Sequence, residues 1–531
     1  MTTINDESSL IESVEDAKNG ISNTKYKVIL ACLFANCFLS SADSTMVVTL
    51  LGKISSDLDS QEHISWVATS YLLSCAAFQP LFGKLSDVFG RKSMLLLCIF
   101  CFSFGCFLCG NAQSLSILVA GRFITGIGGG GLSSLTTIAM SDLVSMRDRG
   151  LYGGYLGVFM DLGAISGGVL AGIFDEIWGW QSAFLIQVPI SLLTGLAIYL
   201  WFDIPKHNED GLTNWERFVG IDWIGSGLLV SSLLTLMLLT GTTDKDFARD
   251  SILWWFFVFY TIIGFITFYF YEDKIDHAII PVKMLHNQTI LITCINWWFM
   301  CMNFYTYVYY LPFYWSSVQN RSPFECGYLF IPSTVISSFT ALFAGWYIKK
   351  TGRYRPLHVV AGLFIFFGSV IVFTASKDDG KIWESIFSLP LRFGTTSNHT
   401  IMLIAMLSSV AKEEQALVTS IQYGFKSCGS TMGVAFANAL MQWKLKGALD
   451  KGFATLPTLP EGWNAEMLAS AKERALEDPS YAFNGLPDII KNTITNGYDS
   501  SCHLVYAFLV VTGLGCLLSI WKTRENTLDR V

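Results

Sequence analysis

Long apolar runs separated by short polar segments repeat along the whole chain. Two of these runs, residues 64–82 and 93–109, flank the charged stretch GKLSDVFGRK (83–92). A helix needs about 20 apolar residues to cross the roughly 30 Å hydrocarbon core of a bilayer, so each run predicts one membrane span. The chain contains fourteen such blocks, at about 28–50, 65–82, 93–110, 115–140, 151–174, 182–202, 223–241, 252–271, 289–311, 325–348, 357–375, 385–410, 416–441 and 503–521.

The composition favours an all-α polytopic membrane protein. Of the 531 residues, 52% are hydrophobic and only 15% are charged, whereas soluble domains carry about 25% charged residues. Residues 1–25 are polar and acidic, so they lack the basic start and apolar centre of a cleavable signal peptide. We therefore expect residues 1–27 to form a disordered tail that precedes the first span.

The basic residues predict that both termini lie in the cytosol. An even number of spans places the termini on one side, and Lys and Arg in tails and short loops are enriched on the cytosolic side. With this orientation, 20 of the 35 Lys and Arg fall in cytosolic tails and loops, 6 in short outer loops and 6 in the long outer loop 442–502. The remaining three, Arg122, Arg392 and Lys426, lie inside predicted spans.

The charged stretch after the second block has a second copy after the tenth block, where residues 345–354 read GWYIKKTGRY. The glycines and one arginine are kept and the acid becomes a base, with Gly83 aligned to Gly345, Gly90 to Gly352, Arg91 to Arg353 and Asp87 to Lys349. Internal repeats of this kind are common in transporters. Two six-helix halves would place the copy after the eighth block, so its position predicts two extra helices between the halves, at 223–241 and 252–271.

This repeat predicts five parts of the chain. In order they are a cytosolic tail (1–27), a six-helix bundle (28–202), a linker with the two extra helices (203–272), a second six-helix bundle containing the luminal loop 442–502 (273–521) and a cytosolic tail (522–531). Glycine permits a tight turn between two spans. We expect Gly83, Asp87, Gly90 and Arg91 to form a cytosolic latch between spans that binds no substrate.

The stretch GKLSDVFGRK resembles the loop signature of the major facilitator superfamily, G-x-x-x-D-x-x-G-R-K. Four further segments resemble family motifs in the expected order, namely the fourth-span motif with a buried arginine (118–131), the fifth-span antiporter motif (157–172), the sixth-span entry (178–190) and the ninth-to-tenth region of the fourteen-span drug:proton antiporters (309–332). Gly168 stands where the fifth-span motif usually has proline, and Gln181 replaces the usual arginine. The resemblance covers roughly residues 28–521.

Within that group, residues 65–87 and 141–150 are most similar to fungal vacuolar basic amino acid transporters. The resemblance implies the major facilitator fold, with two six-helix bundles plus two inserted helices, and no enzymatic activity. It further implies proton-coupled antiport of lysine, arginine and histidine from the cytosol into the vacuole. Two alternatives stay open: a multidrug/proton antiporter of the plasma membrane, and a relative that has lost transport and acts as a nutrient receptor.

Carboxylates inside the spans are the first candidates for coupling. A charge at the bilayer centre costs roughly 2.5–3.5 kcal/mol on insertion scales, so such residues are candidate functional sites. Asp43, in the first span, either binds a cation or a proton or is simply hydrated near a helix end. Asp161, in the middle of the fifth span, either tunes selectivity for cations or is a tolerated polar group that faces a lumen.

Three bases and one histidine complete the candidates. Arg122 resembles the arginine that the family associates with proton coupling. Because a guanidinium does not release its proton, its role would be to act on a nearby carboxylate. The alternative is a structural ion pair or carbonyl contact. His399 titrates in the right range or is merely hydrogen-bonded. Lys426 would repel a cationic substrate unless it is neutralised, so we assign it to packing or gating. Arg392, His399 and Lys426 all belong to the second half.

The sequence predicts no phosphate-binding loop and no zinc site. The run GIGGGG (126–131) lacks the preceding strand and the Lys-Ser/Thr of a phosphate-binding loop, so we interpret it as a helix-packing segment. The thirteen cysteines lie mostly inside spans and match no zinc spacing. We expect no metal, no cofactor and no nucleic-acid partner. The expected partners are the lipid bilayer, protons and a small cationic substrate, and we expect a monomer.

The N-terminal tail contains an acidic dileucine pattern formed by Asp6, Leu10 and Ile11. Sorting signals of this type are addresses that a receptor reads, so the motif says nothing about the fold. A pattern this short also arises by chance in acidic tails. Together with the family resemblance, it favours an adaptor complex as partner and the vacuolar membrane over the plasma membrane.

Overall fold

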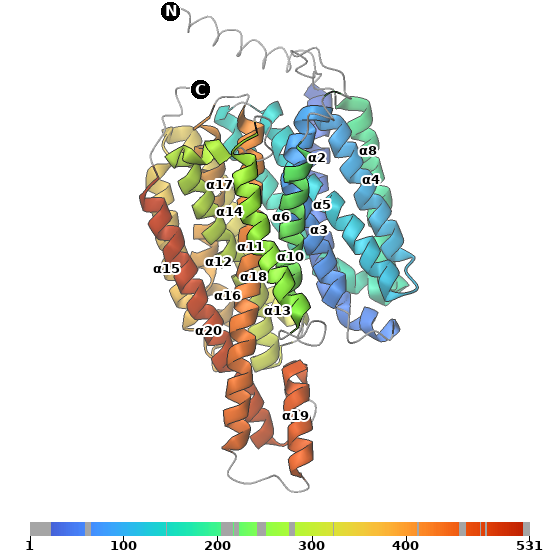
Figure 1. Cartoon of the computed structure of the whole chain (residues 1–531), viewed down its shortest axis with the longest axis vertical. Helices are drawn as coiled ribbons and strands as arrows, with labels where there is room; N and C mark the ends of the chain where they lie inside the picture. The colour runs from blue at the N-terminus through green and yellow to red at the C-terminus, as the bar shows by residue number, and fades with distance from the viewer. Residues whose placement is uncertain are drawn as a thin grey trace, which may run out of the picture.

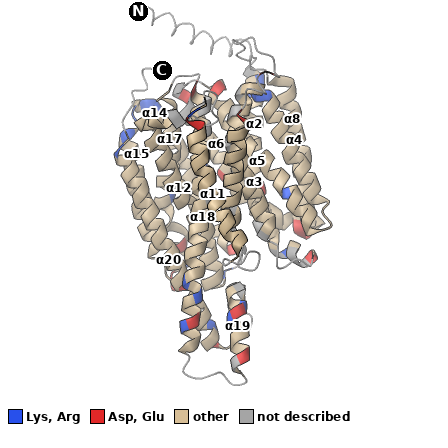
Figure 2. Ribbon diagram, viewed as in Figure 1, with Lys and Arg blue, Asp and Glu red and all other residues tan. Residues whose placement is uncertain are grey.

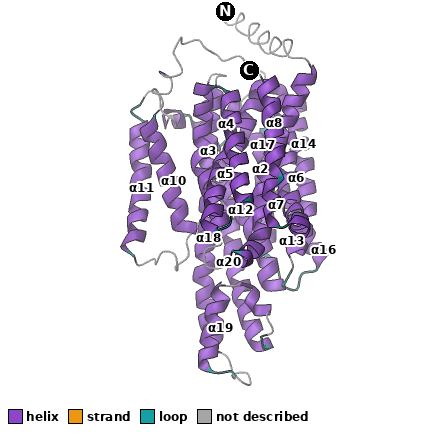
Figure 3. Ribbon diagram, turned by 90° about the vertical axis from the view of Figure 1, so that its right-hand side faces the viewer, coloured by secondary structure: helices purple, strands orange, loops and turns teal. Residues whose placement is uncertain are grey.

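The computed structural model of the chain is helical (Figure 3). It describes residues 23–58, 65–144, 146–202, 216, 222–241, 251–275, 282–321, 323–410, 414–455, 463–477, 479–483 and 486–523. These residues contain no strand, which confirms the predicted all-α class. The dileucine residues Asp6, Leu10 and Ile11 lie outside the described residues.

The first half of the chain forms one bundle. Its helices are α2 (Asn23–Asp57), α3 (Ser65–Phe89), α4 (Arg91–Gly110), α5 (Leu115–Leu143), α6 (Met146–Trp178), α7 (Trp180–Leu185) and α8 (Gln187–Trp201). Helix α2 packs on α6, and α5 packs on α3 and α4. A Cβ added at Gly128 of α5 would lie 2.4 Å from the backbone nitrogen of Phe102 in α4. The GIGGGG run is therefore a helix-packing segment, as predicted.

The second half forms another bundle. Its helices are α12 (Gln288–Gln319), α13 (Pro323–Leu329), α14 (Ile331–Thr351), α15 (Arg355–Phe373), α16 (Lys381–Ile386), α17 (Leu389–Leu407), α18 (Gln415–Ala454) and α20 (Asp488–Trp521). Helix α12 packs on α18 and α20, and α15 packs on α17 and α20. The two bundles meet mainly where α6 packs on α14 and α3 packs on α18.

Two helices between the halves, α10 (Trp223–Gly241) and α11 (Ile252–Glu272), stand at the flank of the molecule (Figure 3). Helix α10 packs on α3 and α18, and α11 packs on α10. Leu233 of α10 is buried in one cluster with Ala77 of α3 and Ile421 of α18. Large apolar side chains of α11, including Phe259 and Ile263, remain exposed and suit contact with lipid. This peripheral position agrees with the predicted insertion.

The first turn of α2 and the end of α20 lie at the same end of the molecule, which we call the terminal face (Figure 1). The opposite end, which we call the far face, carries α19 (Ala465–Glu477). Charged residues gather at the two ends and on the extension around α19, while the middle is mostly uncharged (Figure 2). This distribution is that of a body that crosses a bilayer.

All fourteen predicted blocks coincide with helices. Each block lies on one helix or on two consecutive helices. Within the described residues, nine helical segments are long and apolar enough to cross a membrane by length and hydropathy. The major facilitator architecture is confirmed by this arrangement together with the comparisons given below, while the count of fourteen crossings stays a prediction.

The loop predicted at 83–92 is wrong in length. Helix α3 continues to Phe89 and α4 begins at Arg91, so Gly90 alone forms the turn. Polar residues continue the helix past the apolar block because they are helix-compatible outside the bilayer. Gly90 has φ 89° and ψ 149°, and its counterpart Gly352 has φ 66°. Both φ angles are positive, a backbone conformation that is unfavourable for residues with a Cβ atom. Each glycine therefore permits the turn that follows its span.

The segment 442–502, which we predicted to be a loop, is mostly helical in its described residues. Helix α18 continues to Ala454, α20 begins at Asp488, and α19 packs beside them on the far face (Figure 1). The hydroxyl of Tyr498 donates to the carbonyl of Ala475 at 2.6 Å, which joins α20 to α19. A search for uniformly apolar blocks does not detect helices of this amphipathic kind, which is why the prediction failed.

We predict that Gly90→Ala destabilises the fold by about 1–3 kcal/mol, because its backbone conformation is essentially restricted to glycine. Gly352→Ala should cost about 1–2 kcal/mol, since the left-handed helical region is less unfavourable. Gly380 provides the control, because its φ is −76° and an added Cβ would meet nothing within 4 Å. Thermal melting of the purified variants in detergent measures these effects. Equal melting of Gly90→Ala and Gly380→Ala would contradict the assignment.

Candidate functional site

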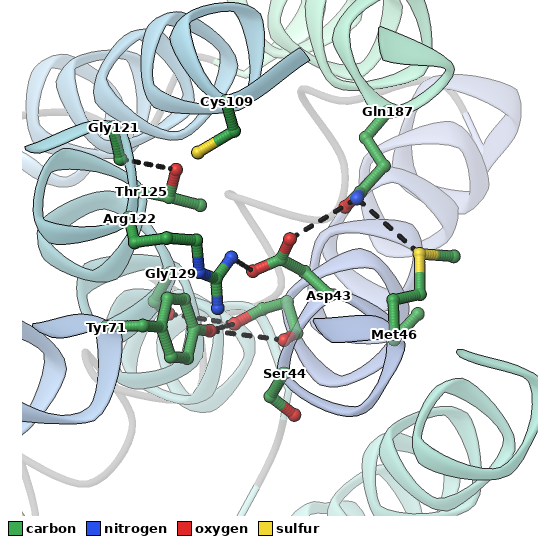
Figure 4. Close-up of polar contacts among 12 residues, drawn as sticks. Asp43, Ser44, Met46, Tyr71, Cys109, Gly121, Arg122, Thr125, Gly129 and Gln187 are labelled. Carbon is green, nitrogen blue, oxygen red and sulfur yellow. Dashed lines mark hydrogen bonds and ion pairs between the residues drawn. The ribbon is translucent and has the colours of Figure 1, made fainter. Parts of the chain in front are cut away.

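Asp43 and Arg122 form an ion pair inside the first bundle (Figure 4). Arg122 Nη1 lies 2.7 Å from Asp43 Oδ2, and the two side chains are 1% and 0% exposed. Gln187 Nε2 donates to the other carboxylate oxygen at 3.3 Å. Because these residues belong to α5, α2 and α8, the contacts join three helices through one carboxylate.

The Arg122 guanidinium also contacts neutral groups of α3. Its carbon lies 4.3 Å from the ring centroid of Tyr71, and its Nε donates to the carbonyl of Val67 at 3.4 Å. An aromatic face stabilises a desolvated cation. The geometry thus contains both features foreseen for a structural role, an ion pair and a carbonyl contact. Removing one partner of a buried pair leaves an uncompensated charge, which lowers the free energy of unfolding by about 3–5 kcal/mol.

Asp161 and Arg392 form a second ion pair, and this one crosses between the bundles. Arg392 Nη2 of α17 lies 3.1 Å from Asp161 Oδ1 of α6. Ser337 of α14 donates to the other carboxylate oxygen at 2.5 Å and contacts the Thr396 hydroxyl at 2.8 Å. Asp161 is 23% exposed, so this carboxylate is more accessible than that of Asp43.

His399 lies on α17, the helix that also carries Arg392, and Lys426 lies on α18. The His399 ring meets Trp297 edge-on, with centroids 4.8 Å apart, and it lies within electrostatic range of both Lys426 and Arg392. The Lys426 ammonium is 5.2 Å from the Tyr423 ring centroid. The structure therefore places Asp43 and Arg122 together inside the first bundle, Asp161 at the contact between the bundles, and His399 against α12 of the second bundle.

Both copies of the charged stretch bind the same segment, residues 141–150. Arg91 Nε lies 2.9 Å from Asp142 Oδ2 at the end of α5, and Arg91 Nη1 donates to the Ser86 hydroxyl at 2.5 Å. In the second copy, Lys349 pairs with Asp148 of α6. The first contact stays within one bundle, whereas the second joins the two bundles.

Further contacts join the bundles toward the terminal face. The Tyr423 hydroxyl of α18 donates to the Thr137 hydroxyl of α5 at 2.8 Å. A Cβ added at Gly154 of α6 would lie 2.9 Å from the carbonyl oxygen of Ala341 in α14. These contacts lie on the terminal side of Asp161, so they close the terminal half of the interface between the bundles.

For the other predicted latch residues, Gly83 and Asp87, we describe no side-chain contact between spans. Gly83 lies within α3, and its carbonyl accepts a hydrogen bond from Ser86 at 2.7 Å. The Asp87 side chain is outside the described residues. Among the side chains that the structure does describe, no group of three or more His, Cys, Asp or Glu converges as metal ligands would.

Sequence reasoning missed the neutral partners of both carboxylates. Gln187 is an amide in an otherwise apolar run, and an amide inside a span is a usable signal because it needs a hydrogen-bond partner there. Ser337 and Thr396 carry no comparable signal, because serine and threonine are frequent in membrane helices and commonly bond their own backbone. Their roles appear only when α6, α14 and α17 are brought together.

Comparisons with known proteins place the chain in a family. Residues 33–434 match the sequence model of the Major Facilitator Superfamily. The chain is 34% identical over 433 residues to the multidrug resistance protein fnx1 of Schizosaccharomyces pombe, covering 81% of each chain. It is 30% identical over 504 residues to the vacuolar membrane amino acid uptake transporter fnx2 of the same yeast, covering 93% of this chain and 83% of the relative.

A solved structure supports the same fold. The proton:xylose symporter XylE superposes with a TM-score of 0.57 at 15% identity, covering 94% of this chain and 96% of the symporter. At that identity the likeness concerns the fold alone. The sequence model and the two yeast relatives carry the family assignment: the chain is a member of the Major Facilitator Superfamily, whose proteins are membrane carriers.

Proposed function

We propose that the protein is a proton-coupled antiporter that moves basic amino acids from the cytosol into the vacuole. The observation that carries this proposal is the Asp161–Arg392 pair, a partly exposed carboxylate held between the two bundles by a base. The likeness to a vacuolar amino acid uptake transporter over 93% of the chain supports the substrate class.

Competition at Asp161 provides a simple coupling mechanism. When the carboxylate is ionised, the cationic side chain of a substrate can replace Arg392 as its partner. When a proton occupies the carboxylate, its attraction for the substrate cation is lost. Proton and substrate therefore bind alternately, which is the requirement for exchange. Because Asp161 and Arg392 belong to different bundles, each replacement also changes how strongly the bundles hold together.

Asp43 and Arg122 have a different part in the proposal. Arg122 keeps its charge at any physiological pH, so a proton on Asp43 leaves the arginine without a counter-ion. Both side chains are almost fully enclosed. A proton can therefore reach Asp43 only when α2, α5 and α8 shift, and this requirement links protonation to a change of conformation. His399, on the same helix as Arg392, is the remaining candidate for proton transfer.

An acidic vacuole suits such an exchanger. Exchange of one proton for one monovalent cation moves no net charge, so the membrane potential contributes nothing. Each unit of pH difference then supplies about 1.4 kcal/mol, which corresponds to about tenfold accumulation. No further energy source is needed to concentrate a basic amino acid in the vacuole.

A second candidate function is export of cationic drugs at the plasma membrane. The likeness to a multidrug resistance protein, at 34% identity over 81% of the chain, favours it. The same carboxylate between the bundles would bind a drug cation. A transport-dead receptor is less well supported, because the intramembrane acids and bases form pairs across and within the bundles that a receptor would not require.

The proposed function implies a location in the vacuolar membrane, with both termini in the cytosol. With the terminal face in the cytosol, the Asp6, Leu10 and Ile11 pattern precedes α2 on the side where adaptor complexes act. The Arg91–Asp142 and Lys349–Asp148 pairs would then form the cytosolic latch, with α19 in the vacuolar lumen. The protein would work as a monomer.

Uptake of labelled lysine into isolated vacuolar vesicles tests the function directly. We expect accumulation of about tenfold per unit of pH difference, lost when the gradient is collapsed. Asp161→Asn should abolish this accumulation because the amide cannot exchange a proton for a cation. Asp378→Asn, at an exposed carboxylate on the far face, is the matched control and should accumulate lysine normally. Wild-type accumulation by Asp161→Asn would remove Asp161 from the mechanism.

The Asp43–Arg122 pair calls for a double-mutant cycle. Asp43→Asn and Arg122→Gln should each destabilise the protein by about 3–5 kcal/mol, because each leaves one buried charge unpaired. The double variant should recover much of that loss in thermal melting. It should nevertheless fail to couple lysine uptake to the pH gradient. Recovery of both stability and coupling in the double variant would assign the pair to structure alone.

Fluorescence imaging tests the predicted address. Replacement of Leu10 and Ile11 by alanine should move a tagged protein from the vacuolar membrane to another membrane, because an adaptor reads the two aliphatic side chains. Replacement of Ser8 and Ser9 by alanine is the control and should leave the location unchanged. Vacuolar location of the Leu10/Ile11 variant would exclude this signal. A wild-type protein at the plasma membrane would favour the drug-export alternative.

A further inference from the structure

Lys426 is a base inside the membrane body that has no acidic partner among the residues described by the structure. It lies eleven residues after the start of α18 at Gln415, or about 16 Å along the helix axis. Arg122 and Arg392, the other two bases inside the spans, each pair with an aspartate. Among the residues that the structure describes, no carboxylate lies within ion-pair distance of the Lys426 ammonium, which lies 5.2 Å from the centroid of the Tyr423 ring.

The surroundings of Lys426 come from both bundles. Helix α18, which carries Lys426, packs on α3 of the first bundle and on α12 of the second bundle. Its neighbour Tyr423 donates to Thr137 of α5. The ammonium therefore lies between the bundles, in the region that a transported molecule must pass if it moves between the two halves.

The described bases inside the spans of the second bundle are Arg392 and Lys426. Asp161 of the first bundle pairs with Arg392, whereas the Lys426 ammonium meets the ring of Tyr423. A lysine ammonium in a membrane interior is costly unless an anion or strong acceptors meet it. Snorkelling does not remove this cost, because about 16 Å of helix separates Lys426 from the start of α18. The ring of Tyr423 compensates in part, as a cation–π contact, but supplies no negative charge.

We propose that Lys426 binds the carboxylate of the transported amino acid. The inference rests on the proposed function and deepens it, because it assigns the two ends of the substrate to separate groups. Asp161 would take the cationic side chain, and Lys426 would take the carboxylate through charge-assisted hydrogen bonds. The base that would repel a drug cation then becomes the group that selects an amino acid over a cation without a carboxylate.

Lysine and cadaverine provide the matched pair of probes, because cadaverine is lysine without its carboxylate. Vesicles containing the full-length protein would be tested for lysine uptake and for inhibition of that uptake by cadaverine. We expect wild-type protein to bind lysine at least about tenfold more tightly than cadaverine, the range expected for a hydrogen bond to a charged group. A wild-type protein that does not discriminate between them would overturn the inference.

Substitutions locate the discrimination. Lys426→Gln should raise the KM for lysine by about tenfold or more and leave inhibition by cadaverine unchanged or stronger. Lys426→Arg should keep most of the discrimination, since the charge remains. Lys350→Gln removes an exposed lysine from the terminal end of α14. This control should change neither the KM for lysine nor the inhibition by cadaverine. Melting temperatures and vesicle content confirm that each variant is folded and inserted.

The outcomes separate this inference from the proposed function. Absence of gradient-driven lysine uptake by wild-type protein contradicts the function itself. Normal lysine uptake with an unchanged lysine-to-cadaverine ratio in Lys426→Gln contradicts only the role of Lys426. Replacement of chloride by gluconate tests the other source of negative charge. If removal of chloride weakens lysine binding as much as Lys426→Gln does, the anion is chloride and the carboxylate assignment fails.

Discussion

The cost of placing a charge inside a bilayer is the constraint on which the site depends. It requires each buried acid to meet a base, and the two aspartates inside the spans both do so. The difference between the pairs lies in where the partners come from. Asp43 and Arg122 belong to one bundle, so their pairing joins helices within that bundle alone. Asp161 and Arg392 belong to different bundles, so their pairing can only persist while the bundles are close.

The internal repeat gives the terminal face its closing contacts. Each copy of the charged stretch places a base beside the segment 141–150, where Arg91 meets Asp142 and Lys349 meets Asp148. The second copy has Lys349 where the first copy has an acid. This base allows the second bundle to bind Asp148 of the first bundle. Exposed pairs of this kind contribute little to stability, typically 0–1 kcal/mol. A weak contact would suit the proposed latch, which would open and close during transport.

The sequence predicted the helices and the family well because both depend on local patterns. Apolar blocks mark spans through bilayer thickness alone, and the repeat locates the inserted helices. The sequence failed at 83–92 and 442–502, where polar residues continue helices beyond the bilayer. It identified Asp43, Arg122 and Asp161 as single residues but could not pair them. The partner of Asp161 lies 231 residues away in the sequence. Nothing in the sequence distinguishes Ser337 from other serines, because its contact with Asp161 forms only when α14 packs on α6.

Charge balance between the bundles also bears on what the protein can select. A drug that carries only positive charge adds to an interface where the described charges include the bases Arg392 and Lys426 and the acid Asp161. A basic amino acid can carry the same net charge, yet it brings a carboxylate to Lys426, which has no acidic partner among the described residues. Its own cation can then take the carboxylate that Arg392 otherwise occupies. Selectivity for amino acids over drugs would thus depend on Lys426, a residue whose positive charge by itself argues against any cationic substrate.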